Sequence, residues 1–151
     1  MGYSQYRVFF DTSVYIAALL SSDGAAGELL RLAEAGVIGM IVSEEVIAEA
    51  DRVLARKFPE LVQENRKLWK HLKPEIAPHP SASQSKSFLE KLPRGDATIL
   101  YAAKLSSPSV FVTWNTRDFL KHDVMSLVDF PIVVPAECLK LFRKWLEPFL
   151  H

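Results

Sequence analysis

Four short apolar runs along the chain predict strands that are buried on both faces. Each run is rich in Val, Ile or Phe and lacks the polar alternation of a half-exposed strand. The longer segments between them carry apolar residues at helical spacing, and strands that alternate with helices form a parallel sheet covered on both faces. The runs cover residues 7–10, 37–42, 109–113 and 132–134, and the helical segments cover residues 14–20, 25–35, 43–58, 60–72, 97–105 and 136–149.

The stretch at residues 73–87 looks the least regular, because it holds three prolines and four serines. Pro74 and Pro78 would confine a short strand at residues 75–77 to a sheet edge, since proline cannot donate to a central ladder. Residues 88–92 predict one helical turn before Pro93. The pattern as a whole predicts a three-layer α/β/α sandwich around a parallel sheet of four to five strands, in one domain over residues 1–151.

Composition narrows the possible functions. The chain has 18 basic and 18 acidic residues, so it carries no basic coat, and contact with nucleic acid requires a local basic patch or metal ions. The one cysteine, Cys138, and the absence of CxxC and HExxH motifs argue against zinc. The four histidines, His71, His79, His122 and His151, have no metal-ligand spacing. No apolar run is long enough for a membrane span, so we expect a cytoplasmic protein without a membrane partner.

A carboxylate stands where the first strand meets the first helix. Asp11 ends the run Val8-Phe9-Phe10, and Thr12 or Ser13 is expected to cap the helix that follows. Ligands of open α/β sheets bind at the carboxyl ends of the strands, which makes Asp11 a candidate site residue. The alternative is that Asp11 serves only as a helix N-cap.

Three more acids have a comparable context. Glu49 lies about 60° around its helix from Val46, at the edge of the apolar stripe. Asp96 stands at the start of the central helix, and Asp118 follows the third strand. Each has an ordinary alternative: an ion pair of Glu49 with Arg52 or Arg56, a helix cap at Asp96, and a turn cap or an ion pair with Arg117 at Asp118.

Together these carboxylates predict a site for a hard cation, because like charges at one sheet edge cannot all stay ionised without a cation between them. Motifs for other chemistry are missing. The first strand is followed by neither GxxxxGK[ST] nor GxGxxG, and no GxSxG occurs. A haloacid-type phosphatase would need a second Asp where Ser13 stands, and the acid pair of a receiver domain is absent.

Four segments resemble the PIN domain family in order and spacing. They are VFFDTS at residues 8–13, IVSEEVIAE at 41–49, GDATILYAA at 95–103 and VTWNTRDF at 112–119. The likeness runs over nearly the whole chain and is greatest to VapC-like ribonucleases, the toxin components of toxin–antitoxin systems. It implies an α/β/α sandwich and a ribonuclease that depends on Mg²⁺ or Mn²⁺.

The resemblance places the family's acids on Asp11, Glu49 and Asp96. Many members have a fourth Asp where this chain has Asn115, and others use an acid three residues later, here Asp118. We therefore expect Asp11, Glu49, Asp96 and Asp118 to be the catalytic and metal-binding residues. The supporting polar residues are Thr12, Ser13, Thr113 and Asn115.

Arg94 and Arg117 flank two of these acids and are candidate RNA contacts. A wider basic lip is possible, although solvated helix faces explain most of its members: Arg52, Arg56, Lys57, Arg66, Lys67, Lys70 and Lys73. The alternative function is a catalytically silent PIN module that binds RNA or a protein. The broad apolar stripe of the last helix, around Phe142 and Trp145, suggests a homodimer or an antitoxin partner, or simply a well-buried helix.

Overall fold

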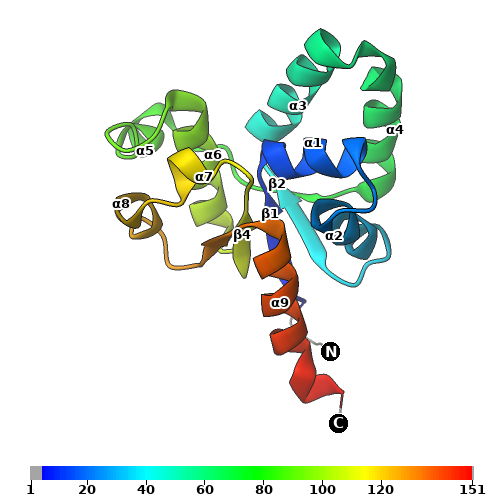
Figure 1. Cartoon of the computed structure of the whole chain (residues 1–151). Helices are drawn as coiled ribbons and strands as arrows, with labels where there is room; N and C mark the ends of the chain where they lie inside the picture. Colours follow the sequence, from blue (N-terminus) through cyan, green and yellow to red (C-terminus); the bar gives the residue numbers. More distant parts are fainter. Residues whose placement is uncertain (1–4, 151) are drawn as a thin grey trace.

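The protein is an α/β sandwich around five parallel strands, as the computed structural model of residues 5–150 shows (Figure 1). The chain-end His151 lies outside the described residues. The strand order is β3-β2-β1-β4-β5, so the first strand of the chain is central. This confirms the predicted fold class. The strands are β1 (Arg7–Phe10), β2 (Gly39–Val42), β3 (Glu75–Ile76), β4 (Val110–Val112) and β5 (Ile132–Val133).

The central strand is buried on both faces, as its unbroken apolar run predicted. Val8, Phe9 and Phe10 have no exposed surface, because β2 and β4 pair with the edges of β1 while helices cover its faces. Phe9 stacks on Phe111 of β4 at a ring-centroid distance of 5.2 Å. This packing holds the carboxyl ends of β1 and β4 side by side, and the predicted site residues follow both ends.

The long helices agree with the apolar periodicity. The helices are α1 (Thr12–Leu20), α2 (Ala25–Glu34), α3 (Glu44–Lys57), α4 (Val62–Leu72), α5 (Ala82–Lys86), α6 (Arg94–Ser106), α7 (Thr116–Phe119), α8 (His122–Met125) and α9 (Pro135–Leu146), with short 3₁₀ turns at Pro59–Leu61 and Glu147–Phe149. Ser43 caps α3 as predicted, since its Oγ accepts from the Val46 N–H at 3.2 Å. None of the helices in residues 5–150 has both the length and the apolar character needed to cross a membrane.

Several boundaries differ from the sequence prediction. The second strand begins at Gly39 rather than Val37, because Gly36 adopts φ +75° and the Val37 N–H donates to the Leu32 carbonyl, which closes α2. Helix α5 was not predicted; a capping box between Ser81 and Gln84 starts it without apolar periodicity. The short α8 was also not predicted. Residues 88–92 form the expected single turn, closed by the Leu92 N–H, which donates to the Phe88 carbonyl at 3.0 Å.

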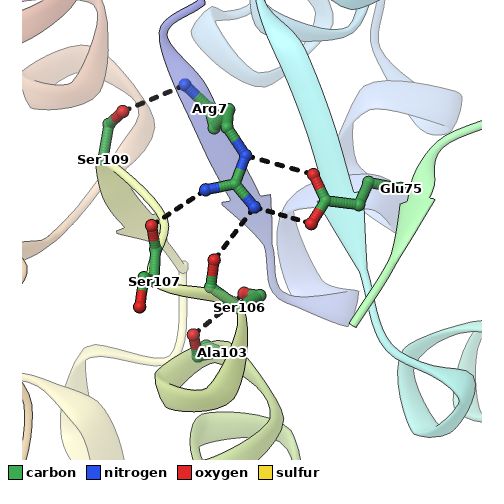
Figure 2. Close-up of polar contacts among 6 residues, drawn as sticks. All are labelled: Arg7, Glu75, Ala103, Ser106, Ser107 and Ser109. Atoms are coloured by element: carbon green, nitrogen blue, oxygen red, sulfur yellow. Dashed lines mark hydrogen bonds and ion pairs between the residues drawn. The ribbon is translucent and has the colours of Figure 1, made fainter. Parts of the chain in front are cut away.

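The amino ends of the strands are joined by one arginine (Figure 2). Arg7 binds both carboxylate oxygens of Glu75, at 3.1 and 2.6 Å, and donates to the carbonyls of Ser106 and Ser107 at 2.9 Å each. Its side chain passes over Gly39, where a Cβ would lie 3.3 Å from the Arg7 Cγ. Arg7 thus links β1 to the edge strand β3 and to the end of α6.

The last helix buries most of its apolar stripe. Cys138, Leu139 and Phe142 are in the core, and the rings of Trp145, Tyr6 and Phe142 all contact one another, with centroids 5.4–6.0 Å apart. Leu150, beyond the helix, is 67% exposed. The stripe is therefore largely accounted for by packing within the chain, and the expected homodimer stays a prediction.

Candidate active site

Asp11 follows β1 directly and occupies the N-cap position of α1, yet its carboxylate makes no cap hydrogen bond. The expectation that Thr12 or Ser13 caps this helix is wrong, because the helix already begins at Thr12. Instead, Asp11 Oδ2 accepts from Thr113 Oγ1 at 2.7 Å and from Ser13 Oγ at 3.0 Å. The side chain is only 4% exposed. A buried carboxylate held by hydroxyl groups and not used as a cap is suited to bind a ligand.

The pKa of Asp11 is raised to about 6, mainly by burial and to a smaller extent by the negative charge of Glu49. The hydrogen bonds from Thr113 and Ser13 act in the opposite direction, because they stabilise the ionised form. The carboxyl group is therefore ready to ionise close to neutral pH, and a neighbouring positive charge would favour that ionisation.

The loop after β4 is tied to the start of α1 through the same two hydroxyl groups. Ser13 Oγ accepts from the main-chain N–H of Trp114, and Thr113 Oγ1 accepts from the N–H of Asn115, both at 2.9 Å. The Trp114 side chain is 47% exposed. Sequence reasoning missed this main-chain connection, because no side-chain pattern reports a backbone donor. The loop that carries Asn115 and Asp118 is thereby held next to Asp11.

The second group of polar side chains joins α6 to α7. Asn115 Nδ2 donates to Asp118 Oδ2 at 3.0 Å and lies 3.4 Å from Asp96 Oδ2. Helix α6 begins at Arg94 rather than Ala97, with Pro93 at the N-cap, so Asp96 is the third helical residue and not the cap. Asn115 is the N-cap of α7, and its Oδ1 accepts from the Asp118 N–H at 3.4 Å. One amide thus bridges two carboxylates.

Charge repulsion is strongest at Asp96. Its pKa is raised to about 7, first by partial burial and then by the negative charges of Asp11, Asp118 and Glu49. The pKa of Asp118 is instead lowered, because Asn115 donates to it and Arg117 lies beside it with Nε 3.5 Å from Oδ1. Asp96 therefore feels the charge of all three other candidate acids, which come from different elements of the fold.

Glu49 faces the start of α6 from α3. Its Oε2 lies 4.0 Å from the position that a Cβ would take at Gly95, next to Asp96. Among residues 5–150 it has no ion pair with Arg52 or Arg56; Arg52 binds Glu45 instead at 2.8 Å. The ion pair of Glu49 with Arg52 or Arg56 is therefore absent from the described residues, and a Cβ at position 95 would be in ordinary van der Waals contact with this carboxylate.

The donor set fits a hard divalent cation in its chemistry. Oxygen ligands and unneutralised carboxylates with raised pKa values are what Mg²⁺ or Mn²⁺ would stabilise. As the side chains stand, no group of three or more acids, histidines or cysteines within the described part of the chain is gathered to hold a metal ion. The four candidate carboxylates lie around one region, but among the described residues no three of them are close enough together to bind one ion.

The remaining predicted residues lie around this centre. Thr12 is buried, and its Oγ1 has no hydrogen-bond partner among the described residues. The Arg117 side chain is 87% exposed beside Asp118. Arg94 lines a cavity between α5 and α6 on the other side of the α6 start. Members of the predicted basic lip, such as Arg66, lie on exposed faces, and Arg66 pairs with Asp51 at 3.5 Å.

Comparison with known proteins identifies a family and a shared fold. A family model described as a PIN domain matches residues 7–117. No curated protein sequence is significantly similar to the chain. VapBC2 from Rickettsia felis, solved bound to a DNA fragment from its promoter, is similar in fold with a TM-score of 0.59 and 16% identity, over 84% of this chain and 96% of that one.

Two further solved structures share the fold. VapC20 of Mycobacterium tuberculosis, described as a toxin that cleaves the sarcin-ricin loop, has a TM-score of 0.51 and 19% identity, over 69% of this chain and 86% of that one. PAE2754 from Pyrobaculum aerophilum has a TM-score of 0.55 and 16% identity, over 92% of this chain and 96% of that one. At these identities the likeness is one of fold.

Proposed function

The chain belongs to the PIN domain family, and on this basis we propose that it is a divalent-metal-dependent endoribonuclease acting on single-stranded or looped RNA. We further propose that it is the toxin of a toxin–antitoxin pair in the cytoplasm. The fold shared with VapBC2 and VapC20 supports this assignment, and the sarcin-ricin loop cleavage named for VapC20 supports RNA as the substrate class.

One observation carries the proposal: carboxylates from four separate elements act on one another at the carboxyl ends of β1 and β4. Burial first, and then the negative charges of Asp11, Asp118 and Glu49, raise the pKa of Asp96 to about 7. A fold gains no stability from such repulsion, so the arrangement is best explained by a positively charged ligand. An acidic centre would also repel RNA, so the cation is needed for substrate binding as well as for chemistry.

Each side chain has a proposed role. Asp11, Glu49, Asp96 and Asp118 would hold Mg²⁺ or Mn²⁺, directly or through water. Thr113 and Ser13 keep Asp11 ionised and fixed, and Asn115 orients Asp96 and Asp118. When bound, the cation supplies positive charge for the scissile phosphate and lowers the pKa of a water molecule. Arg94 and Arg117 would contact flanking phosphates.

Cleavage assays with purified protein test the proposal. With Mg²⁺ or Mn²⁺ it should cut single-stranded RNA internally and leave 5′-phosphate and 3′-hydroxyl ends, because water rather than the ribose 2′-hydroxyl attacks. EDTA should stop the reaction, and Ca²⁺ should support little cleavage because its looser coordination positions water poorly. Asp11→Asn, Glu49→Gln and Asp96→Asn should each lose most activity. Cleavage that continues in EDTA and leaves 2′,3′-cyclic phosphate ends would contradict the proposal.

A silent PIN module is the second candidate function, and Asn115 is the observation that favours it. The amide of Asn115 stands between Asp96 and Asp118, where many family members carry a further acid, so one negative charge is missing. A silent module would bind RNA or a protein without cutting RNA under any metal. Metal-dependent cleavage by the wild-type chain, lost in Asp96→Asn, separates the two functions.

Partners are proposed on the same basis. A cognate antitoxin protein and a second copy of this chain are the expected partners, with the exposed apolar end of the chain around Leu150 as one contact region. Sedimentation of the purified chain at micromolar concentration tests the homodimer. A monomer under these conditions would remove the dimer from the proposal.

A further inference from the structure

A cavity of about 450 Å³ lies between α5 and α6, outside the carboxylate centre. Figure 1 shows α5 packed beside α6 at the margin of the fold. Three of the lining side chains are basic or can become so, two carry hydroxyl groups, and none is acidic. The lining residues are His79, Pro80, Ala82, Ser85, Lys86, Leu89, Arg94 and Thr98.

The two permanent cations of this cavity are available for a ligand. Within residues 5–150, neither the Lys86 nor the Arg94 side chain makes an ion pair or a hydrogen bond. By comparison, Lys91 on the same segment pairs with Asp123 at 3.7 Å. Two unpaired cations in a concave site favour an anionic group such as phosphate.

The cavity also offers apolar surface. Leu89 is 39% exposed on its wall, which Pro80 and Ala82 also line. The hydroxyl groups of Ser85 and Thr98 already donate to main-chain carbonyls, at 3.0 and 3.1 Å, so they remain as acceptors. Cations, hydroxyl acceptors and an apolar wall together match one nucleotide, with its phosphate, ribose and base.

The cavity and the carboxylate centre share the first turn of α6. Arg94 faces the cavity, whereas Asp96, two residues later, faces Asn115. Only the start of one helix separates them, a width of about 10–12 Å with side chains, which a short stretch of single-stranded RNA can cross. At the rim, His79 Nδ1 lies 3.7 Å from Glu44 at the start of α3, the helix that carries Glu49.

We propose that this cavity binds a nucleotide of the RNA strand next to the scissile phosphate, with Lys86 and Arg94 on its phosphate and Leu89 against its base. This inference rests on the proposed ribonuclease function and adds a binding subsite to it. The strand passes over the start of α6 from the carboxylates into the cavity. The RNA on one side of the scissile phosphate is thus held in the cavity.

Binding of a fluorescently labelled single-stranded RNA tests the subsite separately from cleavage. The measurement uses the full chain in an Asp96→Asn background with Mn²⁺, with and without Lys86→Glu. We expect Lys86→Glu to weaken binding about tenfold, as loss of a charge-assisted contact does, and Arg94→Gln to act in the same direction. Each should reduce the slope of log K against log salt by about 0.7, the value for one phosphate contact of a single strand.

Lys140→Glu is the matched control, because Lys140 is an exposed lysine on α9, outside the cavity. It makes the same charge change and should leave affinity and salt slope near those of the parent. Equal affinity and slope in Lys86→Glu and Lys140→Glu would overturn the subsite, whereas metal-dependent cleavage by the wild type would still support the proposed function. A chain that binds the strand through Lys86 but cuts no RNA would keep the cavity as an RNA-binding site and overturn the nuclease. Absence of any RNA binding would overturn the subsite.

Discussion

Thr113 Oγ1 donates a 2.7 Å hydrogen bond to Asp11 Oδ2, although the two residues are 102 positions apart in the chain. The parallel pairing of β1 and β4, in which Phe10 lies opposite Val112, places both residues just beyond the ends of their strands. Both side chains are buried. This bond stabilises the ionised form of a carboxylate whose burial alone would favour the neutral form.

Thr113→Val tests this bond with a side chain of nearly the same shape. We expect the pKa of Asp11 to rise above about 6 and the pH midpoint of metal binding to move upward with it, because less stabilisation remains for the carboxylate. The free energy of unfolding should fall by about 2 kcal/mol. Titrations of Mn²⁺ binding across pH measure the first effect and chemical denaturation measures the second.

Ser126→Ala is the control, since that exposed hydroxyl only donates to the Asp123 carbonyl at 3.1 Å. It should change neither the pH midpoint nor stability by a measurable amount. An unchanged pH midpoint in Thr113→Val would show that the hydroxyl group does not tune Asp11.

The metal-free protein should lose stability as the pH rises from about 4 to about 7. Asp11 and Asp96 hold their protons more tightly when folded, with pKa values of about 6 and about 7. Over this range the folded state binds more protons than the unfolded state, so the free energy of unfolding decreases with increasing pH. Urea denaturation in EDTA at a series of pH values measures this slope.

Asp96→Asn should flatten that slope and stabilise the metal-free protein at pH 8 by about 1 kcal/mol, a discounted value because Asp96 is partly exposed. Asp129→Asn, which removes an exposed carboxylate outside the site, should leave the slope as it is. A loss of stability in Asp96→Asn at pH 8 would instead indicate that Asp96 supports the start of α6.

Asn115→Asp should convert a bridging donor into a further metal ligand. Without metal we expect the free energy of unfolding to fall by about 1–2 kcal/mol, because Asp96 and Asp118 lose the Nδ2 donor and gain a negative neighbour. With Mn²⁺ the increase in melting temperature should exceed that of the wild type, since tighter binding to the folded state stabilises it more. Thermal denaturation with and without Mn²⁺ measures both.

Asn115→Ser separates the two contributions, because it removes the bridging amide without adding charge. It should show the loss of stability but no larger response to Mn²⁺. If Asn115→Asp responds to Mn²⁺ no more than Asn115→Ser, position 115 lies outside the metal-binding set.

Arg7→Lys should destabilise the fold at the amino ends of the strands, opposite the site. Lysine cannot reproduce the two bonds to Glu75 together with those to the Ser106 and Ser107 carbonyls, so we expect a loss of about 2 kcal/mol. Glu75→Gln should cost only about 0.5–1 kcal/mol, because the Glu75 side chain is 48% exposed and the ion pair is screened.

Denaturation at low and high salt distinguishes the parts of this cluster. In 1 M NaCl the effect of Glu75→Gln should shrink, while that of Arg7→Lys should largely remain because its carbonyl bonds are not ion pairs. RNA cleavage per folded molecule should stay at the wild-type level in both variants, as the carboxylates lie at the other ends of the strands. A parallel loss of cleavage would show that the two ends are coupled.

The sequence alone determined the class of fold, because its physical basis is local. Short unbroken apolar runs rich in Val and Phe, such as Val8–Phe10, favour strands covered on both faces, and their alternation with amphipathic helices leaves few arrangements other than a parallel sheet. Asp11 could be recognised for the same reason, since a carboxylate directly after a buried strand must lie at the sheet edge. The PIN resemblance of the segments at residues 8–13, 41–49, 95–103 and 112–119 rested on the same local signals.

Tertiary structure decided what each polar residue contacts. No local pattern shows that Thr113 binds Asp11, that the Asn115 amide lies between Asp96 and Asp118, or that Glu49 faces Gly95 rather than Arg52. These contacts depend on which strands are neighbours and on the rotation of each helix about its axis, which decides where its side chains point. Strand order and helix rotation are set by packing over the whole chain. The contacts of a polar side chain therefore depend on the tertiary structure and not on the residues next to it in sequence.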